Sequence, residues 1–243
     1  MRDIHPTAIV SEKAVIGENV RIGPYAVIGE VEIGDGTIIH PHVVVSDGVR
    51  LGRGVEIFPG AFVGKEPKGA GATARLPQFD RFVDIGDECS IGPHAVVFYD
   101  VKIGANTLLG DGASIREKCR IGSRCIVSRY VTINYDTTVG DRVKIMDNTH
   151  ITGNARLEDD VFVSTMVGTA NDNQIRAGFG EHITGPIIER SAFIGAGATL
   201  LPGTRIGAHA IVASGSVVTK DVGEGTLVAG IPARFVRSAK SDA

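Results

Sequence analysis

The chain lacks tryptophan altogether, and aromatic residues make up only 5% of its 243 residues. A core built on large rings is therefore not expected, and the 32 glycines suit small, tightly turned units instead. A marked excess of either charge is also missing, because the formal net charge is −3. This balance provides no general positive field for nucleic acid, so we expect no nucleic-acid partner.

Long apolar runs are missing as well. No stretch reaches the roughly 20 residues that a membrane span requires. The N-terminus has no charged stretch followed by a signal-like apolar segment. We therefore expect a cytoplasmic protein without a membrane partner.

The chain has instead a six-residue period. From residue 85 to residue 163 an aliphatic residue occupies every sixth position, and a small or β-branched residue follows four positions after each of them. The fourteen aliphatic positions are Ile85, Ile91, Val97, Ile103, Leu109, Ile115, Ile121, Val127, Ile133, Val139, Ile145, Ile151, Leu157 and Val163. Six residues fit neither the 3.6-residue period of a helix nor plain alternation, so each hexad is predicted to be a short strand followed by a turn.

Three hexads make one triangular coil of a solenoid, in which residues 18 apart stack at about 4.8 Å. The inward aliphatic residues then form ladders that bury apolar area against one another. The period covers residues 4–64, 85–167 and 188–222, which amounts to thirty-one hexads or about ten coils. We predict an all-β fold, a parallel β-helix that forms a single domain over residues 1–243.

Two segments interrupt the period, and a tail follows it. Residues 65–83 and 168–186 carry proline, glycine, asparagine and charge without periodicity, so they are predicted to be loops that project from the coils. Residues 223–243 form the C-terminal tail. Long loops of this kind are often functional lids, although a mobile loop without a role is an equally open alternative.

The three cysteines, Cys89, Cys119 and Cys125, all fall in the small inward position. Cys89 and Cys125 share a side but lie two coils apart, about 9 to 10 Å by the inter-strand spacing. A disulfide needs Cα atoms closer than about 7 Å. We predict three reduced cysteines that fill the core.

The residue after each inward aliphatic residue is expected to lie at a corner of the coil. On two of the three sides this residue is often glycine, as at Gly86, Gly92 and Gly104. We attribute these glycines to a positive φ at a tight corner. The third side has no glycine at this position and reads Phe98, Arg116, Asn134, Thr152.

The next two positions on the third side complete a candidate site. They read Tyr99, Glu117, Tyr135, Gly153 and then Asp100, Lys118, Asp136, Asn154. One edge of the solenoid thus gathers aromatic, acidic, amide and basic groups over four successive coils. Acidic residues are frequent at other corners too, so a plain charge-alternating ladder of small energetic weight remains an alternative.

Both ends of the repeat carry familiar segments. The chain opens with Ile4-His5-Pro6-Thr7-Ala8-Ile9, and the repeat ends with Val217-Val218-Thr219-Lys220-Asp221 followed by Val228-Ala229-Gly230-Ile231-Pro232-Ala233. With the hexads, these segments resemble the hexapeptide-repeat acyltransferases, and the ending resembles the coenzyme A-dependent acetyltransferases among them. The resemblance implies that the β-helix is left-handed, that the protein forms a homotrimer, and that acetyl-coenzyme A or another acyl-coenzyme A is the co-substrate.

Two further segments narrow the implied activity. Residues 133–140 resemble the segment in which the O-acyltransferases of lipid A synthesis carry a His-Asp pair, but Tyr135 stands at the histidine position here. Residues 115–119 and 145–153 instead resemble enzymes that N-acylate nucleotide-linked amino sugars. A neutral amine is already nucleophilic and needs no general-base histidine. The resemblance therefore implies acyl transfer to the amino group of a dTDP- or UDP-linked amino-deoxysugar by direct attack.

Within this interpretation, Asp136 and Glu117 are expected to contact the sugar ammonium and accept its proton, and Asn134 is expected to orient the sugar. The other expected substrate-binding residues are Tyr135, Asp100, Arg116, Lys118, Asn148 and His150. The phosphates of coenzyme A require cations. The expected cofactor-binding residues are Lys220, Gly230, Arg234 and Arg237.

Two other functions stay open at this point. One is O-acyl transfer on a sugar nucleotide, which Tyr135 disfavours. The other is a non-catalytic β-solenoid scaffold, which predicts the same monotonous repeat on every side. No pair of histidines has the spacing of a β-helix carbonic anhydrase, so no metal is expected.

Overall fold

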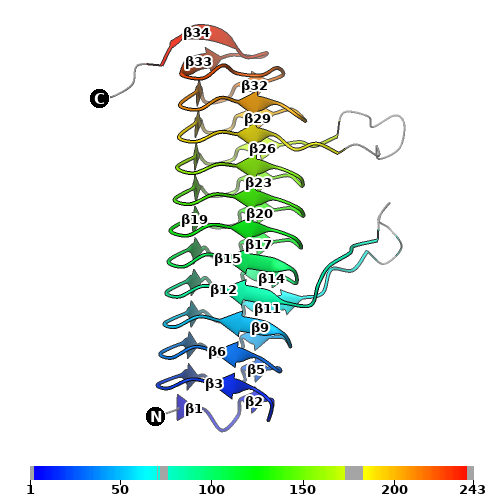
Figure 1. The fold of residues 1–243 in the computed structure, drawn as a ribbon, viewed down its shortest axis with the longest axis vertical. Coiled ribbons are helices and arrows are strands. Elements are labelled where there is room, and N and C mark those ends of the chain that lie inside the picture. The colour runs from blue at the N-terminus through cyan, green and yellow to red at the C-terminus, as the bar shows by residue number, and fades with distance from the viewer. Residues whose placement is uncertain (1–2, 70, 72–75, 173–182, 240–243) are drawn as a thin grey trace.

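The computed structural model describes residues 3–69, 71, 76–172 and 183–239. In this part of the chain the backbone winds into coils stacked in a single column (Figure 1). Each coil gives one short strand to each of three sheets, which contain 13, 11 and 10 strands. The described residues form no helix, and so none that could cross a membrane. The predicted all-β solenoid is confirmed.

The 13-stranded sheet, called sheet A here, is parallel except for the hairpin at its C-terminal end. Its strands are β1 (Asp3–Ile4), β4 (Arg21–Ile22), β7 (Ile38–Ile39), β10 (Glu56–Ile57), β13 (Ser90–Ile91), β16 (Leu108–Leu109), β19 (Ile126–Val127), β22 (Lys144–Ile145), β25 (Phe162–Val163), β28 (Phe193–Ile194), β31 (Ile211–Val212), β33 (Thr226–Ala229) and β34 (Arg234–Ser238).

The other two sheets are parallel throughout. Sheet B consists of β2 (Ile9–Val10), β5 (Val27–Ile28), β8 (Val44–Val45), β11 (Phe62–Lys65), β14 (Val96–Phe98), β17 (Ser114–Ile115), β20 (Thr132–Ile133), β23 (His150–Ile151), β26 (Gly168–Thr169), β29 (Thr199–Leu200) and β32 (Val217–Val218). Sheet C consists of β3 (Val15–Ile16), β6 (Glu32–Ile33), β9 (Val49–Leu51), β12 (Val83–Ile85), β15 (Val101–Ile103), β18 (Arg120–Ile121), β21 (Thr138–Val139), β24 (Arg156–Leu157), β27 (Ile187–Ile188) and β30 (Arg205–Ile206).

The ladders of the core follow the predicted period. Ile115 pairs with Ile133, 18 residues on, and all fourteen predicted aliphatic residues are buried. The small positions between them are buried as well, including the three cysteines, which are free thiols. Burying one such aliphatic side chain contributes about 1.5–3 kcal/mol, so the stacked ladders account for most of the apolar stabilisation.

The glycine corners have a different cause from the predicted one. The residues with positive φ lie two positions further on, as at Glu88 (56°), His94 (57°) and Asn106 (60°), and Gly86 is not among them. A Cβ atom on Gly86 would lie 2.6 Å from the backbone nitrogen of Ala105 in the next coil. The attribution to positive φ was therefore wrong. These corners use glycine because the next coil leaves no room for a side chain.

Two excursions leave the column, and both leave from the same edge. The first runs from β11 to β12 and the second from β26 to β27, so both begin at the end of a sheet B strand and return into sheet C. Figure 1 shows them projecting on the same side of the column. Of the second predicted loop, Asn173 and His182 lie outside the described residues.

Candidate active site

The candidate edge lies at the corner between sheets B and C. Its four coils follow β14, β17, β20 and β23, which are consecutive neighbours in sheet B. The coil before them carries the first excursion, and the coil after them carries the second. The predicted site residues of this edge are therefore bracketed by the two excursions.

Stacked rings and cations run along this edge. The guanidinium of Arg116 lies 5.5 Å from the ring centroid of Phe98 and 5.7 Å from that of Tyr135. On the next coil Gly153 makes room for Tyr135, because a Cβ atom there would lie 2.6 Å from Tyr135 Cε2. Cation–π contacts of this kind each stabilise by roughly 0.5–1 kcal/mol where partly exposed. The glycine at position 153 thus leaves the space that the Tyr135 ring occupies.

Glu117 lies inside this ladder. Arg116 donates from Nε to Glu117 Oε2 and from Nη2 to Oε1, both at 2.8 Å, and the Glu117 side chain is only 6% exposed. Both carboxylate oxygens are thus engaged in a bidentate pair, the strongest geometry for an Arg–carboxylate contact. Glu117 is placed to hold Arg116 between the two rings.

Asp136 has the opposite surroundings. Its side chain is exposed, and no ion pair or side-chain hydrogen bond to it occurs among the described residues. Its backbone adopts φ 53°, a left-handed conformation that aspartate tolerates better than most residues. Asn134 and Lys118 lie beside it on the edge and are half-buried. Among the described carboxylates of this edge, Asp136 is therefore the one that can accept a hydrogen bond or a proton from a ligand.

Asp100 anchors the first excursion. Its carboxylate accepts hydrogen bonds from Arg120 Nη2 at 2.6 Å and from the Asp80 backbone N–H at 3.3 Å. Its own N–H donates to the Phe82 carbonyl at 2.7 Å. The Asp100 side chain is only 6% exposed, so most of its carboxylate lies beneath the excursion. Asp100 thus fixes the excursion, and its expected contact with the substrate stays a prediction.

Tyr99 performs a similar task. Its ring stacks on Phe79 with centroids 6.0 Å apart, lies 5.5 Å from the Arg81 guanidinium, and its hydroxyl donates to the Asp47 carbonyl at 2.9 Å. Burial raises the pKa of Tyr99. The second excursion is tied down in the same way by Asn154, whose Nδ2 donates to the Ile183 carbonyl at 2.8 Å.

His150 and Asn148 lie away from this edge. His150 stands on the outer face of sheet B, where its Nδ1 is 2.7 Å from the Thr132 hydroxyl, and partial burial lowers its pKa. Asn148 lies exposed at the corner between sheets A and B. Within one chain the structure therefore does not bring these two residues to Asp136.

The predicted cofactor residues lie around the C-terminal hairpin, at the top of the column in Figure 1. Lys220 and Arg234 line one pocket of about 320 Å³, together with Phe235 and Val228. Gly230 lies in the turn of the hairpin with φ 99°. Arg237 on β34 is exposed and outside this pocket. The structure thus brings together two of the four residues that were predicted to bind the cofactor, Lys220 and Arg234.

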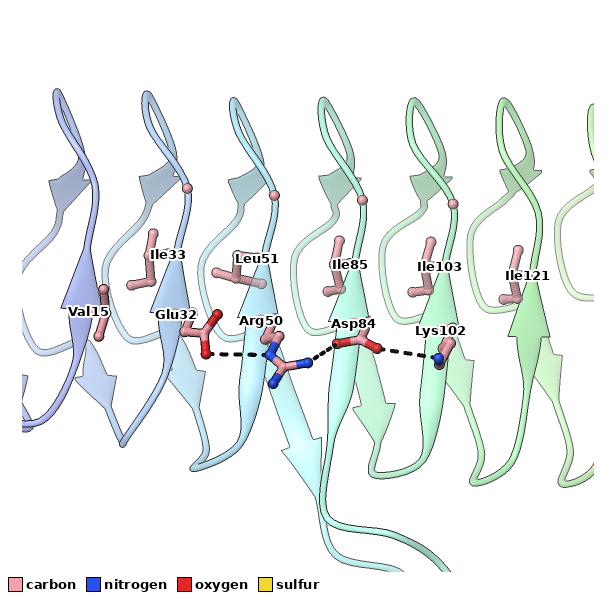
Figure 2. A pocket seen from close by; sticks show the side chains of 14 residues that line it. Val15, Glu32, Ile33, Arg50, Leu51, Asp84, Ile85, Lys102, Ile103 and Ile121 are labelled. Carbon is pink, nitrogen blue, oxygen red and sulfur yellow. Dashed lines mark ion pairs between the residues drawn. The ribbon is translucent and has the colours of Figure 1, made fainter.

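The outer face of sheet C has a different character. Figure 2 shows a row of ion pairs on it, in which Glu32 pairs with Arg50 at 3.5 Å, Arg50 with Asp84 at 3.9 Å and Asp84 with Lys102 at 3.7 Å. The glycine corner beside the row leaves an open groove of about 690 Å³. None of the predicted site residues lines it. Exposed pairs of this kind contribute little stability, about 0.2–1 kcal/mol each.

Apolar side chains are exposed on the other two faces. Leu108 and Phe193 on sheet A are both 40% exposed, and so is Val27 on sheet B, where Ile9 is 67% exposed. Sheet C also has one such residue near its N-terminal end, Val15, which is 66% exposed. In the residues that the structure describes, no three His, Cys, Asp or Glu side chains are grouped as a metal site would require.

Two parts of this chain match a known protein family. The family described as "Bacterial transferase hexapeptide (six repeats)" matches residues 100–135 and 185–220. The first of these ranges contains Arg116, Glu117 and Tyr135, so it covers the middle of the candidate edge and ends one residue before Asp136.

Two relatives are similar over different lengths. The 2,3,4,5-tetrahydropyridine-2,6-dicarboxylate N-acetyltransferase of Staphylococcus aureus (strain bovine RF122 / ET3-1) is 53% identical over 53 residues, which are 22% of either chain. The bifunctional protein GlmU of Heliobacterium modesticaldum is 28% identical over 224 residues, which are 92% of this chain and 35% of GlmU. The matched parts therefore span about a fifth and about a third of these two relatives.

Solved structures resemble the whole column. The Arabidopsis UDP-N-acetylglucosamine acyltransferase matches with a TM-score of 0.69 and 25% identity, over 97% of this chain and 74% of that one. The Francisella novicida enzyme of the same name matches with a TM-score of 0.54 and 22% identity, which shows a shared fold. Two segments of this chain thus match the hexapeptide repeats of the bacterial transferases, and the chain shares its overall fold with these two solved acyltransferases.

Proposed function

We propose that this protein transfers an acyl group from an acyl-coenzyme A to the amino group of a nucleotide-linked amino sugar. The observation that carries the proposal is Asp136, an exposed carboxylate on an edge that contains no histidine. An amine acceptor needs a proton acceptor of this kind, whereas a hydroxyl acceptor needs a stronger general base. The similarity to an N-acetyltransferase and to a UDP-N-acetylglucosamine acyltransferase supports the two parts of the proposal.

In this mechanism Asp136 accepts a proton from the sugar ammonium, and the neutral amine attacks the thioester carbonyl carbon. A C–N bond forms and the C–S bond breaks. The proton that the nitrogen loses as it becomes an amide passes to the leaving thiolate, so that the coenzyme departs as the thiol. General-base assistance of this type accelerates a reaction by about 10²- to 10⁴-fold. Asn134 orients the sugar beside Asp136. Glu117, which we expected to share the proton transfer, serves instead to hold Arg116.

Coenzyme A is proposed to place its phosphates at the C-terminal pocket, where Lys220 and Arg234 supply positive charge. β20 and β32 are four neighbours apart in sheet B, which corresponds to about 19 Å along the column. The pantetheine arm would run along this length, from the pocket toward Asp136. No step of the proposed chemistry requires a metal.

A homotrimer is part of the proposal. The exposed apolar residues on sheets A and B, such as Leu108 and Ile9, would be covered by neighbouring copies, while the row of ion pairs between Glu32 and Lys102 keeps that part of sheet C polar. In such an assembly, His150 on sheet B and Asn148 at the A–B corner would lie on or beside covered faces, where they could approach the edge of a neighbouring copy.

The test is Asp136→Asn, assayed with acetyl-coenzyme A and a nucleotide amino sugar. We expect kcat to fall by about 10²- to 10⁴-fold while binding of both substrates is retained. Asp111→Asn, which removes an exposed corner carboxylate outside the edge, is the matched control and should leave kcat unchanged. An Asp136→Asn enzyme with wild-type kcat would exclude the assigned role.

O-acyl transfer remains a second candidate, because the Arabidopsis acyltransferase matches over nearly the whole chain. Tyr135, at the position where a histidine base would be expected, argues against it. The two candidates are separated by the chemical stability of the product, since an amide resists hydroxylamine and an ester does not.

A further inference from the structure

Lys65 is a cation on the candidate edge that the sequence prediction left inside a loop. It is the last residue of β11, at the point where the first excursion begins. In the register of sheet B it pairs with Phe98, the first residue of the candidate edge. The structure therefore places Lys65 one coil before Phe98 and two coils before Arg116, on the same line of rings and cations.

A β-bulge directs Lys65 to this position. The register between β11 and β14 shifts after Val63, so that Gly64 is skipped and Lys65 pairs with Phe98. Gly64 has φ 87°, and a Cβ atom there would lie 2.9 Å from Ser46 Cβ and 3.3 Å from Tyr99 Cε1. Only glycine fits both demands. Bulges frequently re-aim a side chain beside an active site.

The ammonium group of Lys65 has an aromatic partner but no acidic one. Its Nζ lies 4.1 Å from the ring centroid of Phe98. Within the described ranges no carboxylate forms an ion pair with it, whereas the neighbouring Arg81, Arg120 and Lys102 each have one. A cation held over a ring keeps its charge available for an anionic ligand, because the ring does not neutralise it.

Arg116 provides a second cationic group on the same ring. It uses Nε and Nη2 to bind Glu117, which leaves its Nη1 without a hydrogen bond among the described contacts. Lys65 comes from the coil before Phe98 and Arg116 from the coil after it, so the two cations are about two inter-strand spacings, or about 10 Å, apart. Such a pair suits a ligand that carries two adjacent phosphoryl groups.

We propose that Lys65 and Arg116 Nη1 bind the diphosphate of the acceptor. This inference rests on the proposed function and makes Lys65 a residue that determines its specificity for nucleotide-linked sugars. Coenzyme A also contains a diphosphate, but its proposed site at Lys220 and Arg234 lies beyond β32, seven neighbours from β11 in sheet B, which corresponds to about 34 Å along the column. The sugar beyond the diphosphate would then extend along the edge toward Asp136.

The experiment measures binding without acyl transfer, by calorimetric titration of UDP, dTDP, uridine and coenzyme A into the full chain. We expect Lys65→Met to weaken binding of the preferred nucleoside diphosphate by about ten- to a hundredfold, since a hydrogen bond to a charged group is removed. Lys65→Arg should restore most of the affinity. The affinities for uridine and coenzyme A should stay unchanged.

Lys102→Met is the matched control. Lys102 also lies over a ring, 5.5 Å from the Phe82 centroid, but it faces sheet C and pairs with Asp84. Its removal should leave every affinity unchanged. Wild-type affinity for the nucleoside diphosphate in Lys65→Met would overturn this inference, and so would a loss confined to coenzyme A. A wild-type chain that binds neither UDP nor dTDP would instead overturn the nucleotide-linked acceptor of the proposed function.

Discussion

The glycine at position 153 allows a test of how the edge is built. Gly153→Ala would place a Cβ atom 2.6 Å from Tyr135 Cε2 and 2.8 Å from Tyr135 Cζ. The atoms that must move belong to the end of a side chain, so the ring can swing away. We expect it to leave the Arg116 guanidinium, which it now meets at 5.7 Å.

The stability change should be small. Overpacking costs about 1–3 kcal/mol, but the displaced ring can relax, and alanine at a position without positive φ recovers about 0.4–1 kcal/mol from the unfolded chain. A net loss below about 1 kcal/mol shifts Tm by less than about 4 °C for a chain of this size. The KM for the acceptor should rise several-fold, because Tyr135 and Arg116 no longer pack together.

Gly86→Ala is the control, because its Cβ atom would meet backbone instead of a side chain. The nearest atoms are the nitrogen of Ala105 at 2.6 Å and its Cα at 3.0 Å, in the next coil. Backbone cannot swing away, so we expect a loss of roughly 2 kcal/mol and a Tm lower by about 4–8 °C, with an unchanged acceptor KM. Thermal melts and steady-state kinetics on both variants check this. Wild-type KM in Gly153→Ala would refute a role for the orientation of Tyr135.

Two further predictions concern titratable groups. Burial raises the pKa of Cys119 to about 12 and also raises the pKa of Cys89 and Cys125. The native chain should therefore resist a thiol reagent at pH 8 and react only when it is denatured. Fast labelling of the native chain, followed by mass spectrometry, would contradict the burial of these thiols. The folded state lowers the pKa of His150, so its contribution to stability is present above pH 6.5 and is lost as pH falls through the lower folded value. His150→Gln should flatten this slope in melts between pH 5 and pH 7, and an unchanged slope would contradict it.

The sequence was sufficient for the ladders because the hexad is a local pattern. Positions such as Ile115 and Ile133 recur at a spacing that only a stacked coil can bury, and the structure pairs them as expected. Local pattern also located the corner with Asp136. It did not reveal why the corners at Gly86 and its equivalents need glycine, since that depends on the backbone of the next coil.

The roles of individual edge residues depend on contacts that no period encodes. Glu117 and Asp100 occupy corner positions that suggest exposure. Both side chains are nevertheless buried, and each forms an ion pair with an arginine, Glu117 with Arg116 and Asp100 with Arg120. Lys65 was missed because a one-residue bulge at Gly64 breaks the hexad immediately before it. A glycine followed by lysine at the break in the period was the signal that could have identified it.

The account depends most directly on the bond that the protein forms. The decisive measurement incubates the chain with acetyl-coenzyme A and a panel of UDP- and dTDP-linked amino sugars, follows release of the coenzyme A thiol, and treats the product with hydroxylamine. We predict thiol release that depends on an amino sugar nucleotide and a product that resists hydroxylamine. Release that depends on a sugar nucleotide without an amino group, with a product that hydroxylamine cleaves, would contradict N-acylation at the edge that carries Asp136.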